Sequence, residues 1–377
     1  MPGRATLAEE GDIVDIEIKR GDLSQHRVVD APPAALVDGQ ARLRVESFAL
    51  TTNNITYGVF GDMLRYWQVF PPSGEGEAWG RIPTWGFAEC TESRSSDLVV
   101  GERLFGFMPM STEFVIMPGR ANERSVFDIA ECRAGLPGTY NSYQRCAVDP
   151  LHRPDREPQQ MLLLPLFFTS FIVDDFILDH GDFEASQVIV SSASSKTAIG
   201  VAHRFRARGM RVVGLTSVGN RNFVESLDVY DSVVVYDEVE SIDRVPSVYV
   251  DIAGNRDLLL ALHTHLDGVL RHSMVVGNTN WDAQTSADLS ALPGPTPEFL
   301  FAPVQIAKRT KEWGREELDA RMGSAWHDFD DWTDTWLTLD HHIGPDAVAD
   351  AWERIRSGTL DPAAGDICSL NRGGIDG

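Results

Sequence analysis

The sequence predicts an α/β protein in which an antiparallel β domain precedes a doubly wound parallel sheet. An apolar strand, a turn of small residues, a helix and a second apolar strand follow one another over residues 186–217, which is the order of a βαβ unit. Short apolar strands then alternate with helical segments up to residue 280. The first half contains strands of alternating polarity separated by turns, which favours an antiparallel sheet.

The turn of this βαβ unit lies where a Rossmann unit holds a pyrophosphate. Such a turn usually carries G-x-G-x-x-G, because the backbone must approach the phosphates closely. Here Ser and Ala occupy those places, and they are the next smallest side chains. We therefore predict cofactor contacts from Ser192, Ser194, Ser195, Lys196 and Thr197. The alternatives are a solvated Lys196 and a P-loop, although the P-loop glycines are missing.

The end of the second strand distinguishes NADP from NAD. An NAD-binding unit places an acidic residue there to hold the ribose 2′-hydroxyl. This chain instead has Thr216, Ser217, Asn220 and Arg221, which suit a 2′-phosphate, so we predict NADP(H) as the cofactor. The alternative is that Arg221 begins the next helix on the surface.

Composition limits the partners. The 377 residues carry a formal net charge of -23, from 33 basic and 56 acidic residues, which argues against nucleic acid and anionic membrane surfaces. No apolar run is expected to span a bilayer and no signal-peptide pattern occurs, so we expect a cytoplasmic protein. Four widely spaced cysteines show no metal-binding pattern, and we expect free thiols.

We expect three parts in the chain: residues 1–165 for substrate and catalysis, 166–300 for nucleotide binding, and 301–377 as a helical segment that returns to the first part. Residues 51–58 are expected to form a polar turn, and 161–178 a buried helix between domains. The other expected elements are strands at 12–19, 41–50, 232–236, 247–252, 272–277 and 366–370, and helices at 257–266, 325–337 and 345–357.

Several strings indicate a family. GERLFG at 101–106 resembles a glycine-containing turn of the medium-chain dehydrogenase/reductase superfamily, and residues 42–61 and 188–214 align with its β domain and its nucleotide-binding unit. TTNNITYG, YWQVFPP, WGRIPTWGF, YNSYQR, SSASSKTA and GLTSVGN resemble a bacterial and fungal branch that is defined only as a domain of unknown function. The resemblance implies a GroES-like β domain, a Rossmann domain, a small-molecule substrate and a homodimer.

The chain departs from the zinc-dependent members of that superfamily. Where they carry a cysteine and a Gly-His-Glu segment, this sequence has Thr52 to Asn54 and Trp85 to Phe87, and it has no cysteine cluster. We therefore predict no metal site.

The resemblance also implies site residues. Tyr57 and Asn54 stand where related zinc-free reductases keep catalytic polar groups, and Tyr57 would donate a proton; the alternative is a packed tyrosine whose hydroxyl is satisfied. Thr169, Gly277 and Thr279 are further candidates for cofactor contacts. Trp67, Trp85, Tyr140 and Tyr143 are candidates for substrate contacts, although aromatic residues are more often core.

Together these observations predict a zinc-free NADP(H)-dependent oxidoreductase that transfers a hydride to or from an activated C=C or C=O, as in an enone, a quinone or an enoyl thioester. The loss of the glycine fingerprint leaves an alternative, a non-catalytic NADP-sensing or scaffold protein. A lyase or isomerase on the same fold is a third reading.

Overall fold

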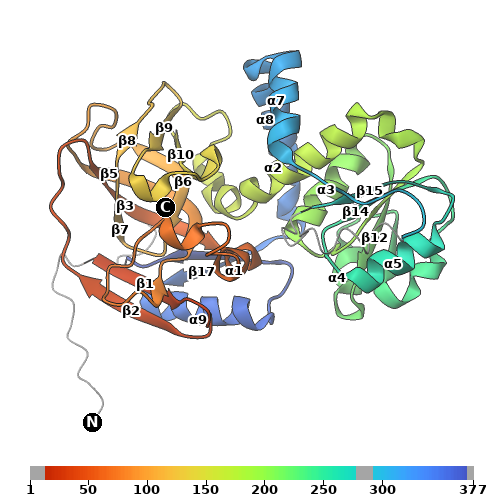
Figure 1. The fold of residues 1–377 in the computed structure, drawn as a ribbon, viewed down its shortest axis with the longest axis horizontal. Helices are drawn as coiled ribbons and strands as arrows, with labels where there is room; N and C mark the ends of the chain where they lie inside the picture. Colours follow the sequence, from red (N-terminus) through yellow and green to blue (C-terminus); the bar gives the residue numbers. More distant parts are fainter. Residues whose placement is uncertain (1–12, 277–291, 372–377) are drawn as a thin grey trace, which may run out of the picture. The chain divides into compact units, whose positions relative to one another are not determined.

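The computed structural model describes residues 13–276 and 292–371. The chain divides into two compact units. Unit 1 comprises Met1–Leu162 and Leu337–Gly377, and unit 2 comprises Leu163–Trp336 (Figure 1). The segment expected at 301–377 is therefore divided at residue 337, because its first two helices belong to unit 2.

Unit 1 contains two sheets. A three-stranded sheet has the order β2-β1-β4, and a nine-stranded sheet has the order β17-β18-β3-β5-β6-β10-β9-β8, with β7 on β3. All pairs are antiparallel except β17 with β18. The strands are β1 (Ile13–Lys19), β2 (His26–Ala31), β3 (Ala41–Leu50), β4 (Trp79–Gly80), β5 (Pro83–Ser93), β6 (Arg103–Pro109), β7 (Glu113–Ile116), β8 (Pro118–Gly119), β9 (Ser125–Asp128), β10 (Ser142–Arg145), β17 (Thr338–Ile343) and β18 (Ala364–Ser369).

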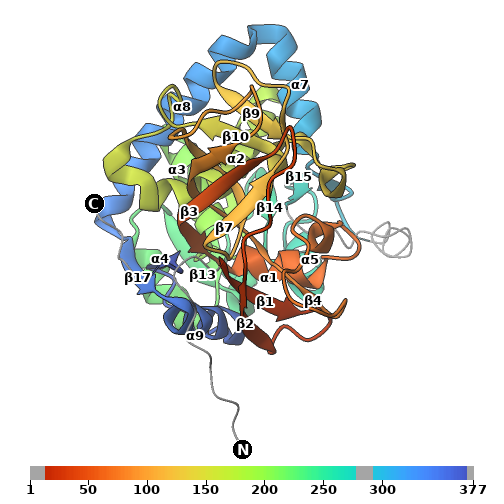
Figure 2. The ribbon, with the colours of Figure 1, turned by 90° about the vertical axis from the view of Figure 1, so that its left-hand side faces the viewer.

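Two α-helices accompany these sheets, α1 (Thr52–Val59) and α9 (Pro345–Ser357), the second of which lies along β1 and β17 (Figure 2). Helix α1 corrects the expected polar turn at 51–58. Thr51 Oγ1 accepts the amide of Asn53 at 3.2 Å, and Asn54 Oδ1 accepts the amide of Thr51 at 2.7 Å. Small polar residues that look like a turn thus form a capping box that starts a helix. Short 3₁₀ turns are η1 (Tyr66–Gln68), η2 (Glu131–Arg133), η3 (Gly138–Tyr140) and η4 (Pro154–Arg156).

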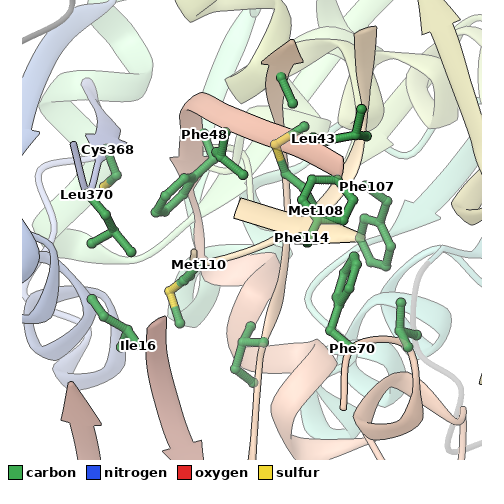
Figure 3. Close-up of a cluster of buried hydrophobic side chains, with 14 of the residues drawn as sticks. Ile16, Leu43, Phe48, Phe70, Phe107, Met108, Met110, Phe114, Cys368 and Leu370 are labelled. Carbon is green, nitrogen blue, oxygen red and sulfur yellow. The ribbon is translucent and has the colours of Figure 1, made fainter. Parts of the chain in front are cut away.

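The core of unit 1 joins the two ends of the chain. Figure 3 shows Ile16 of β1, Phe48 of β3 and Phe107 of β6 in one buried cluster with Cys368 and Leu370. The last strand, β18, pairs antiparallel with β3, as the final apolar segment predicted. The C-terminal segment therefore completes the β domain.

Unit 2 contains one parallel sheet. Its strands are β11 (Gln187–Val190), β12 (Arg211–Thr216), β13 (Ser232–Val235), β14 (Ser247–Asp251), β15 (Leu270–Val275) and β16 (Glu298–Phe299). Their order is β13-β12-β11-β14-β15-β16, and every pair is parallel. Counted from β11, this is the 3-2-1-4-5-6 order of a Rossmann sheet. The predicted doubly wound sheet is confirmed.

Helices surround this sheet in unit 2 (Figure 1). They are α2 (Glu157–Asp179), whose first turns belong to unit 1, α3 (Lys196–Ala207), α4 (Arg221–Ser226), α5 (Arg256–His265), α7 (Ala302–Trp313) and α8 (Arg315–Trp332). The 3₁₀ turns are η5 (Gly181–Glu184), η6 (Val218–Asn220), η7 (Tyr236–Ser241) and η8 (Thr333–Thr335).

Helix α2 is the one helix among the described residues that is long and apolar enough to cross a membrane by length and composition. The helical stretch Pro154–Asp179 has a mean hydropathy of 2.0 in its most apolar window, and 67% of that window is buried in the protein. Its Asp175 pairs with Arg309 of α7 at 2.8 Å. The core helix of a globular protein passes the same test.

Helices α2 and α3 pack closely where α3 begins. A Cβ on Gly200 would lie 2.6 Å from Ser170 Oγ, so only glycine fits without a shift of that side chain. Ser170 Oγ also donates to the carbonyl of Thr197 at 2.9 Å. These contacts fix the N-terminus of α3 and, with it, the preceding turn.

Candidate functional site

The turn between β11 and α3, residues 191–195, is here called the serine turn. Ser195 caps α3, because its Oγ accepts the amide of Ala198 at 3.3 Å. Ser192 has a φ of 54°, the left-handed region that glycine enters without strain. The backbone thus follows a path that favours glycine while carrying serine.

Fixed hydrogen bonds tie the serine turn to β14. Ser191 is buried, and its Oγ donates to Asp251 Oδ1 at 2.9 Å and accepts the amides of Ile252 and Ala253. Tyr249 donates to the same carboxyl oxygen at 3.1 Å. Burial raises the pKa of the Asp251 carboxyl. Strands β11 and β14 flank the point where the strand order reverses, so this group lies where open α/β sheets bind ligands.

Strand β12 brings a second set of predicted residues to the serine turn. Asn220 Nδ2 donates to Ser194 Oγ at 2.9 Å. Arg221 Nε lies 2.9 Å from Glu225 Oε1, and its Nη1 lies 3.6 Å from Glu238 Oε2. Thr216 is buried, and its Oγ1 has no hydrogen-bond partner in the described part of the chain, whereas Ser217 is exposed.

The other predicted cofactor residues lie around the start of α3 or beyond the described chain. Lys196 and Thr197 are the first two residues of α3 and are half-buried. Thr169 is half-buried on α2, next to Ser170. Gly277 and Thr279 lie outside the described residues.

The backbone path and the small side chains of the serine turn are compatible with binding of an anionic dinucleotide. The first turn of α3 leaves backbone amides without intrahelical acceptors, and its dipole favours an anion. Small side chains at 192–195 keep that end of the helix accessible. A pyrophosphate would be held by these amides, and a 2′-phosphate by Asn220 and Arg221.

In unit 1, two hydrogen-bond donors fix the orientation of the Tyr57 hydroxyl. Its oxygen accepts a hydrogen bond from Asn53 Nδ2 at 2.8 Å and another from Trp85 Nε1 at 3.4 Å. Neither bond uses the hydroxyl proton, and the described residues offer that proton no acceptor. Burial raises the pKa of Tyr57, so the phenol is neutral at pH 7. The phenol therefore carries a proton that forms no hydrogen bond with the described residues.

Aromatic rings surround this hydroxyl, and we call Tyr57, Tyr66, Trp85, Phe107 and Tyr140 the Tyr57 cluster. The ring of Tyr57 lies 4.7 Å from that of Tyr66 and 5.3 Å from that of Phe107, centroid to centroid. The Tyr66 hydroxyl donates to the Tyr140 hydroxyl at 3.1 Å. The structure thus brings together three of the predicted residues, Tyr57, Trp85 and Tyr140.

Three other predicted residues serve the core of unit 1. The Asn54 amide caps α1 and donates to the Pro83 carbonyl at 2.8 Å. Tyr143 is fully buried; its hydroxyl donates to the Phe107 carbonyl at 2.6 Å and accepts from Arg133. Trp67 is buried against two glycines, Gly61 and Gly80, where a Cβ would come within 2.3 Å and 2.6 Å of its ring. The polar groups or ring faces of these three residues are used in contacts within unit 1.

Sequence reasoning missed Asn53, Tyr66 and Glu238. Asn53 stands four residues before Tyr57, which is one helical turn, whereas the sequence predicts a non-helical segment. Tyr66 lies in the 3₁₀ turn η1, in a segment that the sequence predicts as a loop. Glu238 lies 3.6 Å from Arg221, a contact across 17 residues that no local pattern predicts.

Possible metal ligands do not gather in the residues that the structure describes. Within 13–276 and 292–371, no three His, Cys, Asp or Glu side chains form a group that could hold an ion. The four cysteines are free thiols.

An antiparallel β unit completed by the end of the chain, followed by a parallel sheet in Rossmann order, is the fold of the medium-chain dehydrogenase/reductase superfamily. The chain belongs to the family described as "protein of unknown function (DUF2855)", which matches residues 48–361. A comparison with curated protein sequences gives no match.

Solved structures share this fold at low sequence identity. CurA from Vibrio vulnificus aligns with a TM-score of 0.56 and 12% identity over 95% of this chain and 99% of its own, and its complex with NADPH aligns with the same score and identity over 95% and 98%. The quinone oxidoreductase from Coxiella burnetii gives 0.55 and 13% over 96% and 100%. The CurF ER cyclopropanase from the curacin A biosynthetic pathway gives 0.55 and 9% over 95% and 99%. Such likeness establishes the fold.

Proposed function

We propose that this protein is a zinc-independent NADP(H)-dependent oxidoreductase that acts on an activated C=C or C=O, such as an enone, a quinone or an enoyl thioester. The observation that carries the proposal is the serine turn on a Rossmann sheet, with Asn220 and Arg221 at the next strand end. The fold it shares with a quinone oxidoreductase and with the NADPH complex of CurA supports the same reading. A nicotinamide bound there supplies or accepts the hydride.

Tyr57 is the proton donor in this proposal. When the phenol gives its proton to the substrate, Asn53 Nδ2 and Trp85 Nε1 remain as donors to the oxygen that gains negative charge. The ring centroids of Tyr140 and Trp85 lie 6.4 Å or less from the centroids of neighbouring rings in the Tyr57 cluster. These aromatic rings favour a planar, conjugated substrate. They also exclude water from the hydroxyl.

The first test is binding. Purified protein is titrated with NADPH and, separately, with NADH, and energy transfer from the tryptophans to the nicotinamide is followed. We expect saturable NADPH binding that is much tighter than NADH binding, because Arg221 can pair with a 2′-phosphate. If neither nucleotide binds, the oxidoreductase proposal is lost.

The second test is chemical. With a substrate found in a panel of enones, quinones and aldehydes, Tyr57→Phe should lower kcat by roughly 10²–10⁴-fold and leave NADPH affinity unchanged. Tyr66→Phe is the matched control, since it removes a neighbouring hydroxyl that bonds only to Tyr140, and it should cost less than about tenfold. Full turnover by Tyr57→Phe would remove the proton-donor role.

A second candidate is a protein that binds NADP without turnover. Two observations favour it. The Asp251 carboxyl is buried where the strand order reverses, and the hydroxyls of Ser191 and Ser194 in the serine turn already form hydrogen bonds within the protein. Turnover with any member of the substrate panel excludes it. Saturable NADPH binding with no turnover across the panel supports it.

The proposal includes a cytoplasmic homodimer. Strand β16 lies at one edge of the described parallel sheet, and Phe299 and Phe301 beside it are exposed. Exposed aromatic residues at a sheet edge favour association. Sedimentation analysis of the wild-type protein and of Phe301→Glu tests it, and a monomer at micromolar concentration contradicts it.

A further inference from the structure

The Tyr57 cluster contains three hydroxyls, and it has more hydrogen-bond donors than acceptors. Tyr66 donates its proton to the Tyr140 hydroxyl at 3.1 Å, and the Tyr57 oxygen accepts from Asn53 and Trp85. The protons of Tyr57 and Tyr140 therefore have no acceptor among the residues that the structure describes. A buried tyrosine hydroxyl usually finds a partner, so two unused protons in one cluster indicate that the acceptor comes from a ligand.

The two hydroxyls belong to rings that are in mutual contact. The ring centroid of Tyr66 lies 4.7 Å from that of Tyr57 and 5.5 Å from that of Tyr140, and the centroids of Tyr57 and Tyr140 are 6.4 Å apart. Burial and, after it, the neighbouring Tyr140 raise the pKa of Tyr57, and burial raises the pKa of Tyr140. Both phenols are therefore neutral donors at pH 7, and each lies within electrostatic reach of the other.

Tyr140 is held at both of its ends. It is the last residue of η3, and Arg133 Nη1 donates to its backbone carbonyl at 3.1 Å. Tyr66 fixes the hydroxyl oxygen, and the ring lies 4.8 Å from that of Phe107. A group that is already held in place loses little freedom when a ligand binds. A hydroxyl whose oxygen accepts a hydrogen bond is also a stronger donor, because linked hydrogen bonds polarise one another.

We propose that the Tyr140 hydroxyl is a second donor, beside that of Tyr57, to the carbonyl oxygen of the substrate, and that Tyr66 is the positioning residue of Tyr140. This inference rests on the proposed function, and it names a carbonyl as the group that activates the substrate. When hydride forms a C–H bond at the reacting carbon, the π electrons move to the carbonyl oxygen. Tyr57 supplies the proton that completes the addition and regains one from water. Tyr140 keeps its proton and stabilises the charge on the oxygen.

A pair of planar probes tests the inference without nucleotide. 4-Nitrophenolate carries a charged oxygen on its ring, and nitrobenzene has nearly the same shape without that oxygen. Each is titrated at pH 8 into the full-length protein, and quenching of tryptophan fluorescence is followed. Tyr140→Phe should weaken 4-nitrophenolate binding by roughly 10- to 100-fold, as expected for loss of a hydrogen bond to a charged acceptor. Nitrobenzene binding should change by less than about twofold, because the ring remains.

Tyr66→Phe is the matched variant, since it removes a hydroxyl that donates within the protein and leaves the Tyr140 hydroxyl in place. It should weaken 4-nitrophenolate binding by less than about tenfold and add nothing in the double variant with Tyr140→Phe. A role in packing alone would weaken the binding of both probes equally. The far-ultraviolet circular dichroism and the melting temperature of each variant establish that it is folded.

The outcomes separate this inference from the proposed function. The inference is overturned if the wild-type protein does not prefer 4-nitrophenolate, if Tyr140→Phe leaves the ratio of the two affinities unchanged, or if Tyr66→Phe changes that ratio as much as Tyr140→Phe does. Saturable NADPH binding and turnover would leave the oxidoreductase proposal standing in each case. A preference that Tyr140→Phe removes, in a protein that binds neither nucleotide, supports Tyr140 as a donor to an oxygen ligand and overturns the oxidoreductase proposal alone.

Discussion

The Tyr57 cluster and the serine turn hold their polar groups in different ways. In the cluster, the orientation of Tyr57 is set by packed rings and by two donors on its oxygen, and its proton remains available. In the serine turn, Ser191 is paired with Asp251 of β14 and Ser194 with Asn220 of η6. One region holds a hydroxyl whose oxygen is paired while its proton has no acceptor among the described residues, and the other pairs two of its serine hydroxyls with neighbouring segments.

This difference determines how each region can respond to a ligand. Packed rings cannot change partners without opening a void, whereas an exposed ion pair or a single hydrogen bond exchanges at small cost. In the proposed function, the Tyr57 cluster would act as a preformed site, and the affinity of the serine turn would depend on which internal contacts a ligand displaces. Mutations should cost most where they remove support from the cluster and least where they relax the turn.

The largest effect is expected from Arg133→Met. The guanidinium of Arg133 is 1% exposed, donates to the Tyr143 hydroxyl at 2.7 Å and to the Tyr140 carbonyl at 3.1 Å, and lies 2.9 Å from Asp128 Oδ2. Its removal leaves the Asp128 carboxylate buried without its cation, which should lower the free energy of unfolding by about 3–5 kcal/mol. Urea denaturation followed by tryptophan fluorescence measures the loss.

The control for this substitution is the double variant Asp128→Asn with Arg133→Met. It removes the unpaired charge and should recover part of the loss, because the remaining cost is that of neutral hydrogen bonds. A loss below about 1 kcal/mol in the single variant would show that Arg133 does not support Tyr140 in the cluster.

The fold could be predicted because hydrophobic periodicity is a local signal. Helix α9 spans Pro345–Ser357 as expected, and strands β11 and β12 bound the helix that the sequence indicated. Helix α1 was missed because Thr51 and Asn54 are residue types that turns and helix caps share, and only the reciprocal hydrogen bonds between them distinguish the two.

The sites could be predicted in part only, because partners far apart in sequence decide what a polar residue does. The sequence singled out Tyr57 and Ser194, and the structure places the first in an aromatic cluster and the second in contact with Asn220. Tyr143 forms hydrogen bonds with Phe107 and Arg133, and Arg221 pairs with Glu238. These contacts join residues that are 10 to 36 positions apart, and spacing in the sequence does not reveal them.

An intermediate effect is expected at His272, which is packed against aromatic rings like the Tyr57 cluster but has an unpaired nitrogen. Its ring lies parallel to that of Phe183 at 4.1 Å, and its Nε2 has no partner in the described chain. Burial, with a smaller contribution from neighbouring His180, lowers the pKa of His272 to about 4. In the unfolded chain the same group has a pKa of about 6.5.

The free energy of unfolding should therefore fall as the pH drops from about 6.5 to about 4, because the unfolded chain takes up a proton that the folded chain does not. The part due to His272 amounts to roughly 2–3 kcal/mol. His272→Phe keeps the stacked ring and should lose less stability than the wild-type protein between pH 7.5 and pH 4.5. Equal losses in the two proteins would contradict this assignment.

The smallest effects are expected in the serine turn itself, and they have opposite signs. Ser192→Gly should raise the free energy of unfolding by about 0.5–1 kcal/mol, since glycine adopts the φ of 54° without steric cost. Ser195→Ala should lower it by about 1 kcal/mol, because the cap on the Ala198 amide is lost.

Differential scanning calorimetry of the two serine variants measures both signs in one experiment. Stabilisation by Ser192→Gly would mean that this chain carries serine at a strained position for a reason other than stability, and the nucleotide titration then shows whether the Ser192 hydroxyl contributes to binding. Destabilisation by Ser192→Gly would mean that the Ser192 side chain holds the turn in place. The serine turn would then resemble the Tyr57 cluster, since both would be fixed by their own side chains before any ligand arrives.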